Sequence, residues 1–215
     1  MLSFSLTSVG AMEIDTDVAL VTENIIIPRL SFGFRWADDV YDIVFYNALG
    51  SSYYSAVNNA MAKWNAVVDP EDPNGNSIHH LSAVTLADPG FVLNTIKFTR
   101  PDQTNINEEF LGYMDEELTS NGVYIEFVTI YLNELDYEWT NGSVAGKYDV
   151  QSVVTHEIGH ALGIKHCHEL SAYPNGGPCW SDTCLQNVMQ PEISSGMTRR
   201  NLRYYDTASY IVIYD

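Results

Sequence analysis

Three histidines and one glutamate stand within eleven residues, in a pattern that suits the binding of a metal ion. The stretch reads His156-Glu157-Ile158-Gly159-His160-Ala161-Leu162-Gly163-Ile164-Lys165-His166. On an α-helix, His156 and His160 are four residues apart and lie only about 40° apart around the axis. Both imidazoles can therefore bind the same ion, and the carboxylate of Glu157 can face a water molecule on that ion.

The third histidine reaches the same ion only if the helix ends. On a continuing helix, His166 would lie roughly 9 Å beyond His160 and about 120° away from its face. Gly163 is the residue best able to take the left-handed backbone conformation that ends a helix. Three neutral nitrogen ligands leave the fourth position of a tetrahedral zinc ion open, as in catalytic sites. The sequence thus predicts one zinc ion, held by His156, His160 and His166.

Such an ion would give Glu157 a defined chemical task. Zinc lowers the pKa of a bound water toward about 7 and polarises a substrate carbonyl. Glu157 would accept the proton of this water as it attacks the carbonyl, and would then deliver the proton to the departing amine. A structural zinc site is the alternative, because Cys167 or His168 could supply a fourth ligand, although neither stands at a matching spacing.

The stretch resembles the H-E-x-x-H-x-x-G-x-x-H signature of the metzincin zinc endopeptidases. A second metzincin mark is a methionine in a tight turn below the metal, and Asn187-Val188-Met189-Gln190-Pro191 is similar to it. The M-x-P form is similar to the matrixin branch. The resemblance implies that Met189 forms a hydrophobic floor below the zinc ligands. Pro191 stands where some relatives have a metal-binding tyrosine, so no tyrosine ligand is expected.

Flanking segments extend the resemblance to about residues 31–215. Ile130 to Asn133 together with Trp139 resembles the strand and tryptophan that precede the matrixin active-site helix, and Asp206 to Tyr214 is similar to the closing helix. The resemblance implies an α+β, zincin-like fold: a twisted mixed β-sheet with a backing helix, an active-site helix and a C-terminal helix. Residues 31–215 would form the catalytic domain, and residues 1–30 an N-terminal extension of open role.

Periodicity predicts the elements that position this site. Apolar residues recur at helical spacing between Tyr53 and Val67, after the possible N-cap residues Ser51 and Ser52 and before Asp69-Pro70. The zinc helix is expected over 150–162, with Asp149 as N-cap. Strands are expected over 32–36, 43–46, 91–98 and 123–132. An edge strand would pair with substrate backbone, and Gly112 to Met114 and Val123 to Phe127 are both candidates.

Composition limits the range of partners. Hydrophobic residues make up 46% of the 215 residues, enough for one core, and 28 acidic against 10 basic residues give a formal net charge of −18. A surface this acidic repels phosphate backbones and anionic lipid headgroups, so neither nucleic acid nor a membrane is expected as partner. A monomer is expected. Acidity is compatible with calcium, but the loop from Asp69 to Asn76 lacks the EF-hand register.

Several other features bear on the setting of the protein. Met1 to Leu20 lacks the basic start and long apolar stretch of a signal peptide, so an extracellular protein would have been trimmed or exported by another route. Cys167, Cys179 and Cys184 all fall between the zinc helix and the methionine turn. One disulfide among them is expected, its pairing left open, against the alternative of three reduced thiols. His79 and His80 are interpreted as surface residues, and no structural zinc is expected.

The predicted function is that of a secreted, zinc-dependent endopeptidase acting on protein or peptide substrates. One alternative is a non-proteolytic module that binds a polypeptide or glycan on a metzincin fold, which the presence of Glu157 disfavours. Another is a different zinc hydrolase, such as a deformylase or amidase, which the third histidine and the methionine turn disfavour. Substrate preference would depend on a pocket wall over Gln190 to Gly196 and on the insertion from Cys167 to Gln186.

Overall fold

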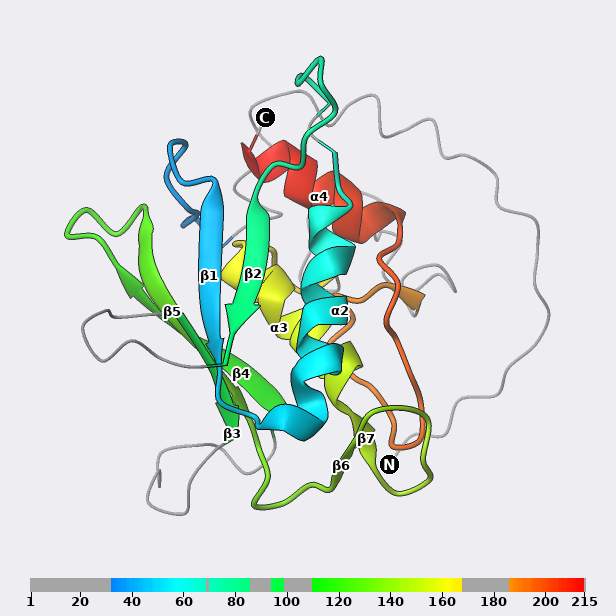
Figure 1. Ribbon diagram of the computed structural model, residues 1–215. Coiled ribbons are helices and arrows are strands. Elements are labelled where there is room, and N and C mark those ends of the chain that lie inside the picture. Colours follow the sequence, from blue (N-terminus) through cyan, green and yellow to red (C-terminus); the bar gives the residue numbers. More distant parts are fainter. Residues whose placement is uncertain (1–31, 69, 86–93, 99–109, 168–185, 215) are drawn as a thin grey trace, which may run out of the picture.

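The computed structural model describes residues 32–68, 70–85, 94–98, 110–167 and 186–214. Residues 1–30 and nearly all of the insertion after His166, with Cys179 and Cys184, lie outside these ranges. The open role of residues 1–30 and the predicted part of the insertion in the pocket wall fall on these residues. Figure 1 shows one layer of β-strands packed against helices that run across its face.

The central sheet has five strands in the spatial order β2-β1-β3-β5-β4. Strands β1, β2, β3 and β5 run parallel, and β4 runs antiparallel to β5. The bounds are β1 Asp42–Asn47, β2 His80–Val84, β3 Asn94–Phe98, β4 Gly112–Leu118 and β5 Ile125–Leu132. The predicted mixed sheet is confirmed. Because β4 stands at the end of this order, its outer side pairs with no strand in the described part of the chain.

Two sequence predictions for strands need adjustment. Residues 32–36 form no strand: Arg35 makes only an isolated bridge to Tyr124, and none of the described strands pairs with the rest of this segment. The strand expected over 123–132 begins at Ile125, and β-branched residues on its buried side explain its position: Val128 and Ile130 are almost fully buried. Residues 94–98 of the strand predicted over 91–98 form β3, and 91–93 lie outside the described residues.

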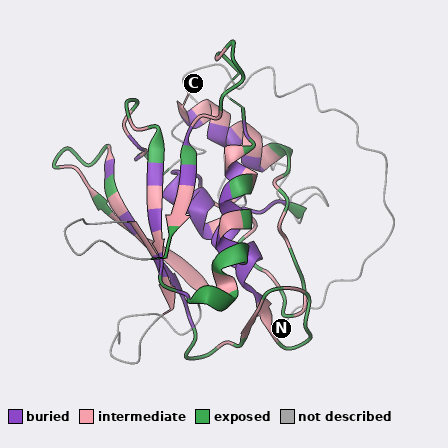
Figure 2. Cartoon of the chain, in the orientation of Figure 1, coloured by how far each residue is buried: buried purple, intermediate pink, exposed green. Residues whose placement is uncertain are grey.

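The helices are α2 Tyr54–Asn65, α3 Val150–Ala161 and α4 Tyr204–Tyr214. Helix α2 packs against β2 and α3, while α3 packs against β4 and β5. These correspond to the backing, active-site and C-terminal helices of the predicted α+β fold. Their inward sides and the sheet enclose one core (Figure 2). A pair of two-residue strands, β6 Trp139–Thr140 and β7 Tyr148–Asp149, precedes α3.

The start of α2 differs from the prediction. Neither Ser51 nor Ser52 caps it: a short 3-10 helix, η2 Ser51–Tyr53, precedes α2 and follows Gly50 with no side-chain cap hydrogen bond. The regular helix also ends at Asn65, two residues before Val67, although Val67 still reaches the core. Tertiary packing of the apolar stripe therefore outweighs local capping here.

Buried indole nitrogens tie α3 to its neighbours. The Nε1–H of Trp64 on α2 donates to the carbonyl of Thr155 over 2.9 Å, and that of Trp36 donates to the carbonyl of Ala161 over 2.9 Å. Next to Ala161, at the same end of α3, the hydroxyl of Tyr214 on α4 donates to the carbonyl of Leu162 over 3.1 Å. Helix α3 is thus held by directional bonds as well as by apolar contact.

The interpretation of His79 as a surface residue is wrong. Its side chain is buried, its Nδ1 lies 2.7 Å from the hydroxyl of Tyr210, and its ring meets that of Tyr214 edge to face at 4.4 Å. Helix α4, more than a hundred residues later in the chain, covers it, which no local pattern around His79 indicates. Burial lowers the pKa of His79 to about 4. His80 is exposed, as predicted, and its Nδ1 lies 2.9 Å from Asp42.

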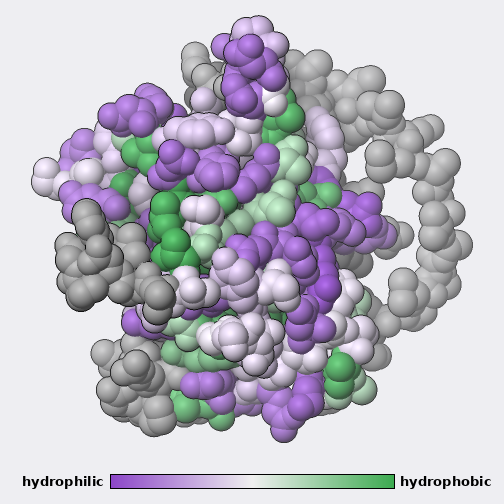
Figure 3. Space-filling view, viewed as in Figure 1, coloured by the Kyte–Doolittle hydropathy of each residue, from purple (hydrophilic) through white to green (hydrophobic). Residues whose placement is uncertain are grey.

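The surface agrees with an acidic, polar protein. On the face seen in Figure 3, hydrophilic residues surround small apolar patches. In the loop expected between residues 69 and 76, the Asp72 carboxylate accepts hydrogen bonds from the backbone N–H groups of Asn74 and Asn76. Among the described helices, none combines the length and apolar character needed to cross a membrane.

Candidate metal centre

Helix α3 begins and ends as its sequence predicts. Asp149 is the N-cap residue, and its carboxylate accepts from the backbone N–H of Ser152 over 3.0 Å. At the other end Gly163 has a φ of 86°. The N–H of Ile164 then bonds back to the carbonyl of Gly159 over 3.0 Å, closing the helix. This turn carries the chain back toward the helix face.

The turn brings the three predicted ligands together. The Nε2 atom of His166 lies 3.1 Å from that of His156 and 3.0 Å from that of His160. The ligand atoms of all three side chains lie within 4.8 Å of one another. Two come from consecutive turns of α3 and one from the segment after Gly163, which is the arrangement that the spacing predicts.

Backbone carbonyls orient two of the imidazole rings. The Nδ1 of His156 lies 2.7 Å from the carbonyl of Val188, and the Nδ1 of His160 lies 2.8 Å from the carbonyl of Ile164. A carbonyl only accepts, so each Nδ1 carries the proton and each Nε2 presents a lone pair to the centre. Burial lowers the pKa of His156 to about 3 and that of His160 well below its usual value.

The three histidine side chains suit a zinc ion. Three neutral nitrogens that converge with their lone pairs inward repel one another unless a cation lies between them, and an all-histidine set with no fourth protein ligand among the described residues is that of catalytic zinc sites. The residues therefore fit one zinc ion. Sequence reasoning identified all three histidines of this cluster. It did not identify the carbonyls of Val188 and Ile164, which have no sequence signature.

Glu157 lies beside the ligands with an unused carboxylate oxygen. The residue is 4% exposed, and its Oε2 has no hydrogen-bond partner among the described residues. Burial raises the pKa of Glu157 to about 8 in the absence of a cation. A zinc ion on the neighbouring histidines would favour the ionised form. The unpartnered Oε2 atom of Glu157 therefore belongs to a residue that lines the same cavity as the three histidines.

The methionine turn lies below the ligands, as the family resemblance implies. Met189 is fully buried, and a side chain on Gly159 of α3 would overlap its sulfur. The backbone N–H groups of Val188 and Met189 donate to the two carboxylate oxygens of Asp206, over 2.9 and 3.1 Å. Helix α4 thus anchors the turn through Asp206, a role that sequence reasoning did not assign to it.

A cavity of about 580 Å³ opens in front of the three histidines and Glu157. Gly112, Tyr113 and Met114 of β4 line one side, whereas no residue of Val123 to Phe127 does. Of the two candidate edge strands, β4 is therefore the one at the cavity. The opposite wall includes Gln190 to Ser194, within the predicted wall, and also Arg199, which sequence reasoning missed.

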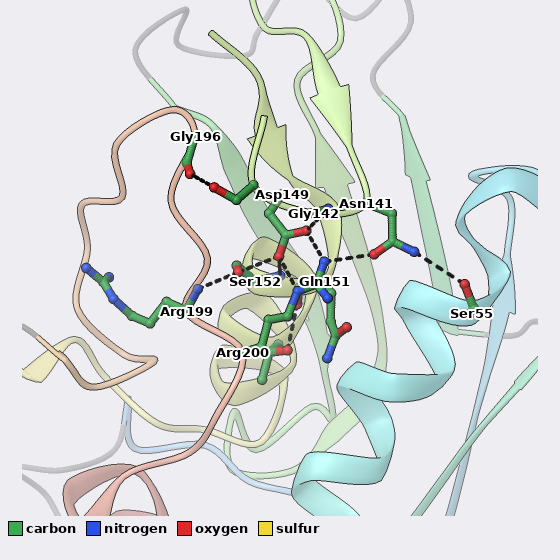
Figure 4. Close-up of polar contacts among 11 residues, drawn as sticks. Ser55, Asn141, Gly142, Asp149, Gln151, Ser152, Gly196, Arg199 and Arg200 are labelled. Atoms are coloured by element: carbon green, nitrogen blue, oxygen red, sulfur yellow. Dashed lines mark hydrogen bonds and ion pairs between the residues drawn. The ribbon is translucent and has the colours of Figure 1, made fainter. Parts of the chain in front are cut away.

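A polar network fixes this wall to the start of α3 (Figure 4). Arg200 donates to both oxygens of the fully buried Asp149, from Nε over 2.8 Å and from Nη2 over 2.5 Å. The backbone N–H of Arg199 donates to the hydroxyl of Ser152 over 2.7 Å. Burial raises the pKa of Asp149, but the bonds from Arg200 and Ser152 outweigh it and leave the pKa below its usual value.

Cys167 directly follows the third ligand and takes part in a disulfide. Its partner lies outside the described residues. The predicted disulfide in this part of the chain is therefore supported, and the choice between Cys179 and Cys184 stays open. The alternative of three reduced thiols does not hold.

The mixed five-stranded sheet, the helix that carries two histidines and the third histidine after a glycine turn together define the zincin class of metallopeptidases. Comparison with family models agrees: the model described as Matrixin matches residues 95–174. This match runs from β3 through the third ligand and ends before the methionine turn. It confirms the resemblance to the matrixin-like metzincins. No curated protein matches the chain.

Proposed function

We propose that this protein is a zinc endopeptidase that hydrolyses internal peptide bonds of proteins or peptides. The observation that carries the proposal is the unpartnered, buried Oε2 of Glu157 in the same cavity as the convergent Nε2 atoms of the three histidines. A buried carboxylate oxygen without a partner is costly, so its retention at this position supports a chemical role. The matrixin match supports the peptidase class.

Strand β4 supports a polypeptide as the substrate. Its outer side pairs with no described strand, and its first residues line the cavity beside Glu157. An extended peptide can add to such an edge through backbone hydrogen bonds, which makes few demands on its side chains. A peptide bound in this way would run past the carboxylate of Glu157.

Zinc held by the three histidines supplies Lewis acidity, because it polarises a substrate carbonyl and lowers the pKa of water. Glu157 accepts a proton at Oε2 from the attacking water as the new C–O bond forms. When the C–N bond breaks, Glu157 returns this proton to the amine nitrogen. The carboxylate is thus regenerated, and one water is consumed for each peptide bond.

The decisive experiment compares zinc-loaded Glu157→Gln with the unchanged protein on casein and on unfolded protein substrates. Hydrolysis should fall by at least about 100-fold, the size typical of a lost general base, while zinc content stays at one ion per chain. Glu126→Gln is the matched control, because Glu126 is an exposed carboxylate on β5 away from the cavity. Undiminished hydrolysis by Glu157→Gln, with zinc content verified, would remove Glu157 from the mechanism.

His166→Ala separates metal retention from proton transfer. It should lose zinc on dialysis, because two histidines alone hold the ion more weakly. If the zinc-loaded, unchanged protein cleaves no polypeptide but still binds one, the non-proteolytic binding module would replace the proposal. None of the observations above favours that alternative.

We further propose an extracellular location. The disulfide at Cys167 supports it, since disulfides persist in oxidising compartments. Detection of the protein in the culture medium of cells that express it would test this, and retention in the reducing cytosol with Cys167 as a free thiol would contradict it.

A further inference from the structure

The side chains of Arg199 and Arg200 follow one another in the chain but point in different directions (Figure 4). The side chain of Arg200 donates hydrogen bonds to both carboxylate oxygens of Asp149. Arg199 joins that network only through its backbone N–H, and its side chain extends away to line the cavity in front of the zinc ligands. The two arginines therefore have different roles.

The guanidinium of Arg199 is partly buried and largely uncompensated. Its side chain donates to a neutral group: Nη1 bonds to the carbonyl of Gln190 over 3.2 Å. In the described part of the chain, no carboxylate lies within 4.0 Å of it. A guanidinium has five N–H donors in a planar fork that matches a carboxylate. Because Arg199 is only partly buried and lines the cavity, its remaining donors can pair with an anionic ligand that enters there.

Arg199 lines the same cavity as His156, His160 and His166. Burial lowers the pKa of Arg199 itself, and the charge of Asp206 opposes this shift. Asp206 does not substitute for a direct partner, because its oxygens already accept from the backbone N–H groups of Val188, Met189 and Arg203.

Building on the proposed peptidase function, we propose that Arg199 is a specificity-determining residue that binds a carboxylate of the substrate beside the scissile bond. The carboxylate is either an aspartate or glutamate side chain or the C-terminal group of a short peptide. A peptide paired with β4 directs alternate side chains toward the cavity, so one of them can meet Arg199 on the opposite wall.

Other carboxylates in the cavity do not cancel this attraction. Glu116 and Glu192 also line it, and Glu192 is exposed. Repulsion from exposed charges and from the net charge of −18 is screened over about 8 Å at physiological salt. A direct bond to a partly buried guanidinium is less screened. A substrate carboxylate that lies directly beside Arg199 is therefore bound in spite of the acidic surroundings.

The test uses matched peptides. The two peptides of the first pair differ only in having Glu or Gln next to the cleaved bond, and both have an amidated C-terminus. The two peptides of the second pair have no acidic side chain and differ only in having a free or an amidated C-terminus. One of the two carboxylates should raise kcat/KM by at least about tenfold over its amide, as expected for a hydrogen bond to a charged group. The pair that shows the effect identifies the source of the carboxylate.

Arg199→Met should reduce this ratio to about one, and Arg199→Lys should leave an intermediate ratio, because it keeps the charge without the fork. Arg203→Met is the control, since Arg203 is exposed and does not line the cavity. A ratio near one in the unchanged protein for both pairs, or a ratio that Arg199→Met does not alter, overturns the inference.

A binding measurement separates this inference from the proposed function. Zinc-loaded Glu157→Gln protein, with and without Arg199→Met, is titrated with the labelled peptides, and the dissociation constants of acid and amide are compared. If the acid peptide binds more tightly than the amide, and Arg199→Met removes this difference, the inference is supported. This holds even if the unchanged protein cleaves no peptide, a result that would overturn only the peptidase proposal. Equal binding of acid and amide, or none of either, overturns the inference.

Discussion

Gly112 and Glu157 approach each other so closely that Gly112 has no room for a side chain. A β-carbon on Gly112 would lie 3.0 Å from Oε1 of Glu157 and 2.9 Å from Cγ1 of Val153. Gly112 begins the edge strand β4, and both of its neighbours belong to α3. The glycine therefore sets how near the carboxylate stands to the strand that we propose to bind substrate.

Gly112→Ala should lower kcat/KM for peptides by at least about tenfold, because a small displacement of a catalytic group is costly to the rate. Zinc content and the far-UV circular dichroism spectrum should not change. An unchanged kcat/KM would mean that α3 and β4 can move apart to make room for the methyl group without displacing Glu157.

Gly159 has a comparable relation to the methionine turn. A methyl group there would overlap the sulfur of Met189 and lie 2.9 Å from the ring of Trp64. Gly159→Ala should therefore reduce the free energy of unfolding by about 1–3 kcal/mol through overpacking, measured by urea denaturation of the zinc-loaded protein. In a double-mutant cycle with Met189→Ala, the cost of Gly159→Ala should shrink. Strictly additive costs would argue against the contact.

The bidentate pair of Arg200 with Asp149 should matter to stability. Arg200→Met leaves a fully buried carboxylate without its cation, which typically costs about 3–5 kcal/mol. Arg200→Lys should recover only part of this, because an ammonium cannot reproduce two parallel bonds. Arg203→Met, at an exposed arginine, should change the free energy of unfolding by no more than about 0.5 kcal/mol. Equal effects of the two Met variants would refute a special role for the pair.

His79 should make stability depend on pH. Its folded-state pKa of about 4 lies below the usual 6.5. Between these pH values His79 is protonated in the unfolded chain and neutral in the folded chain. Stability is therefore lost as pH falls from 6.5 to 4, by roughly 3 kcal/mol at most from this residue. In His79→Gln the slope over this range should be shallower than in the unchanged protein. His80→Gln, at an exposed histidine, should preserve the slope.

Zinc should stabilise the fold through its three ligands. Binding to the folded state alone adds about 2.7 kcal/mol when free zinc exceeds the dissociation constant 100-fold. Thermal unfolding followed with and without zinc should show a higher Tm with the ion, and His166→Ala should remove most of that difference. A zinc-independent Tm in the unchanged protein would contradict the metal centre.

The ligand set follows from local geometry, which explains why it could be predicted. The spacing of His156 and His160 specifies one helix face through the helical repeat alone. Gly163 specifies the turn because few other residues accept a positive φ. The N-cap role of Asp149 likewise depends on a bond to a residue only three positions away. The mixed character of the sheet, in contrast, came from the family resemblance and not from the pattern of any strand, and the order of its strands was not predicted.

Other features depend on contacts between residues that are far apart in the chain. His79 is buried because α4 packs over it, and β4 is the edge strand because β5 pairs with β3 on its other side. Arg200 faces Asp149 while Arg199 faces the cavity, although the two are adjacent and chemically identical. Local sequence is enough to specify which atoms can hold zinc, because helix and turn geometry depend only on neighbouring residues. The surroundings of those atoms, and hence the substrate groups that they accept, depend on long-range packing that no local spacing encodes.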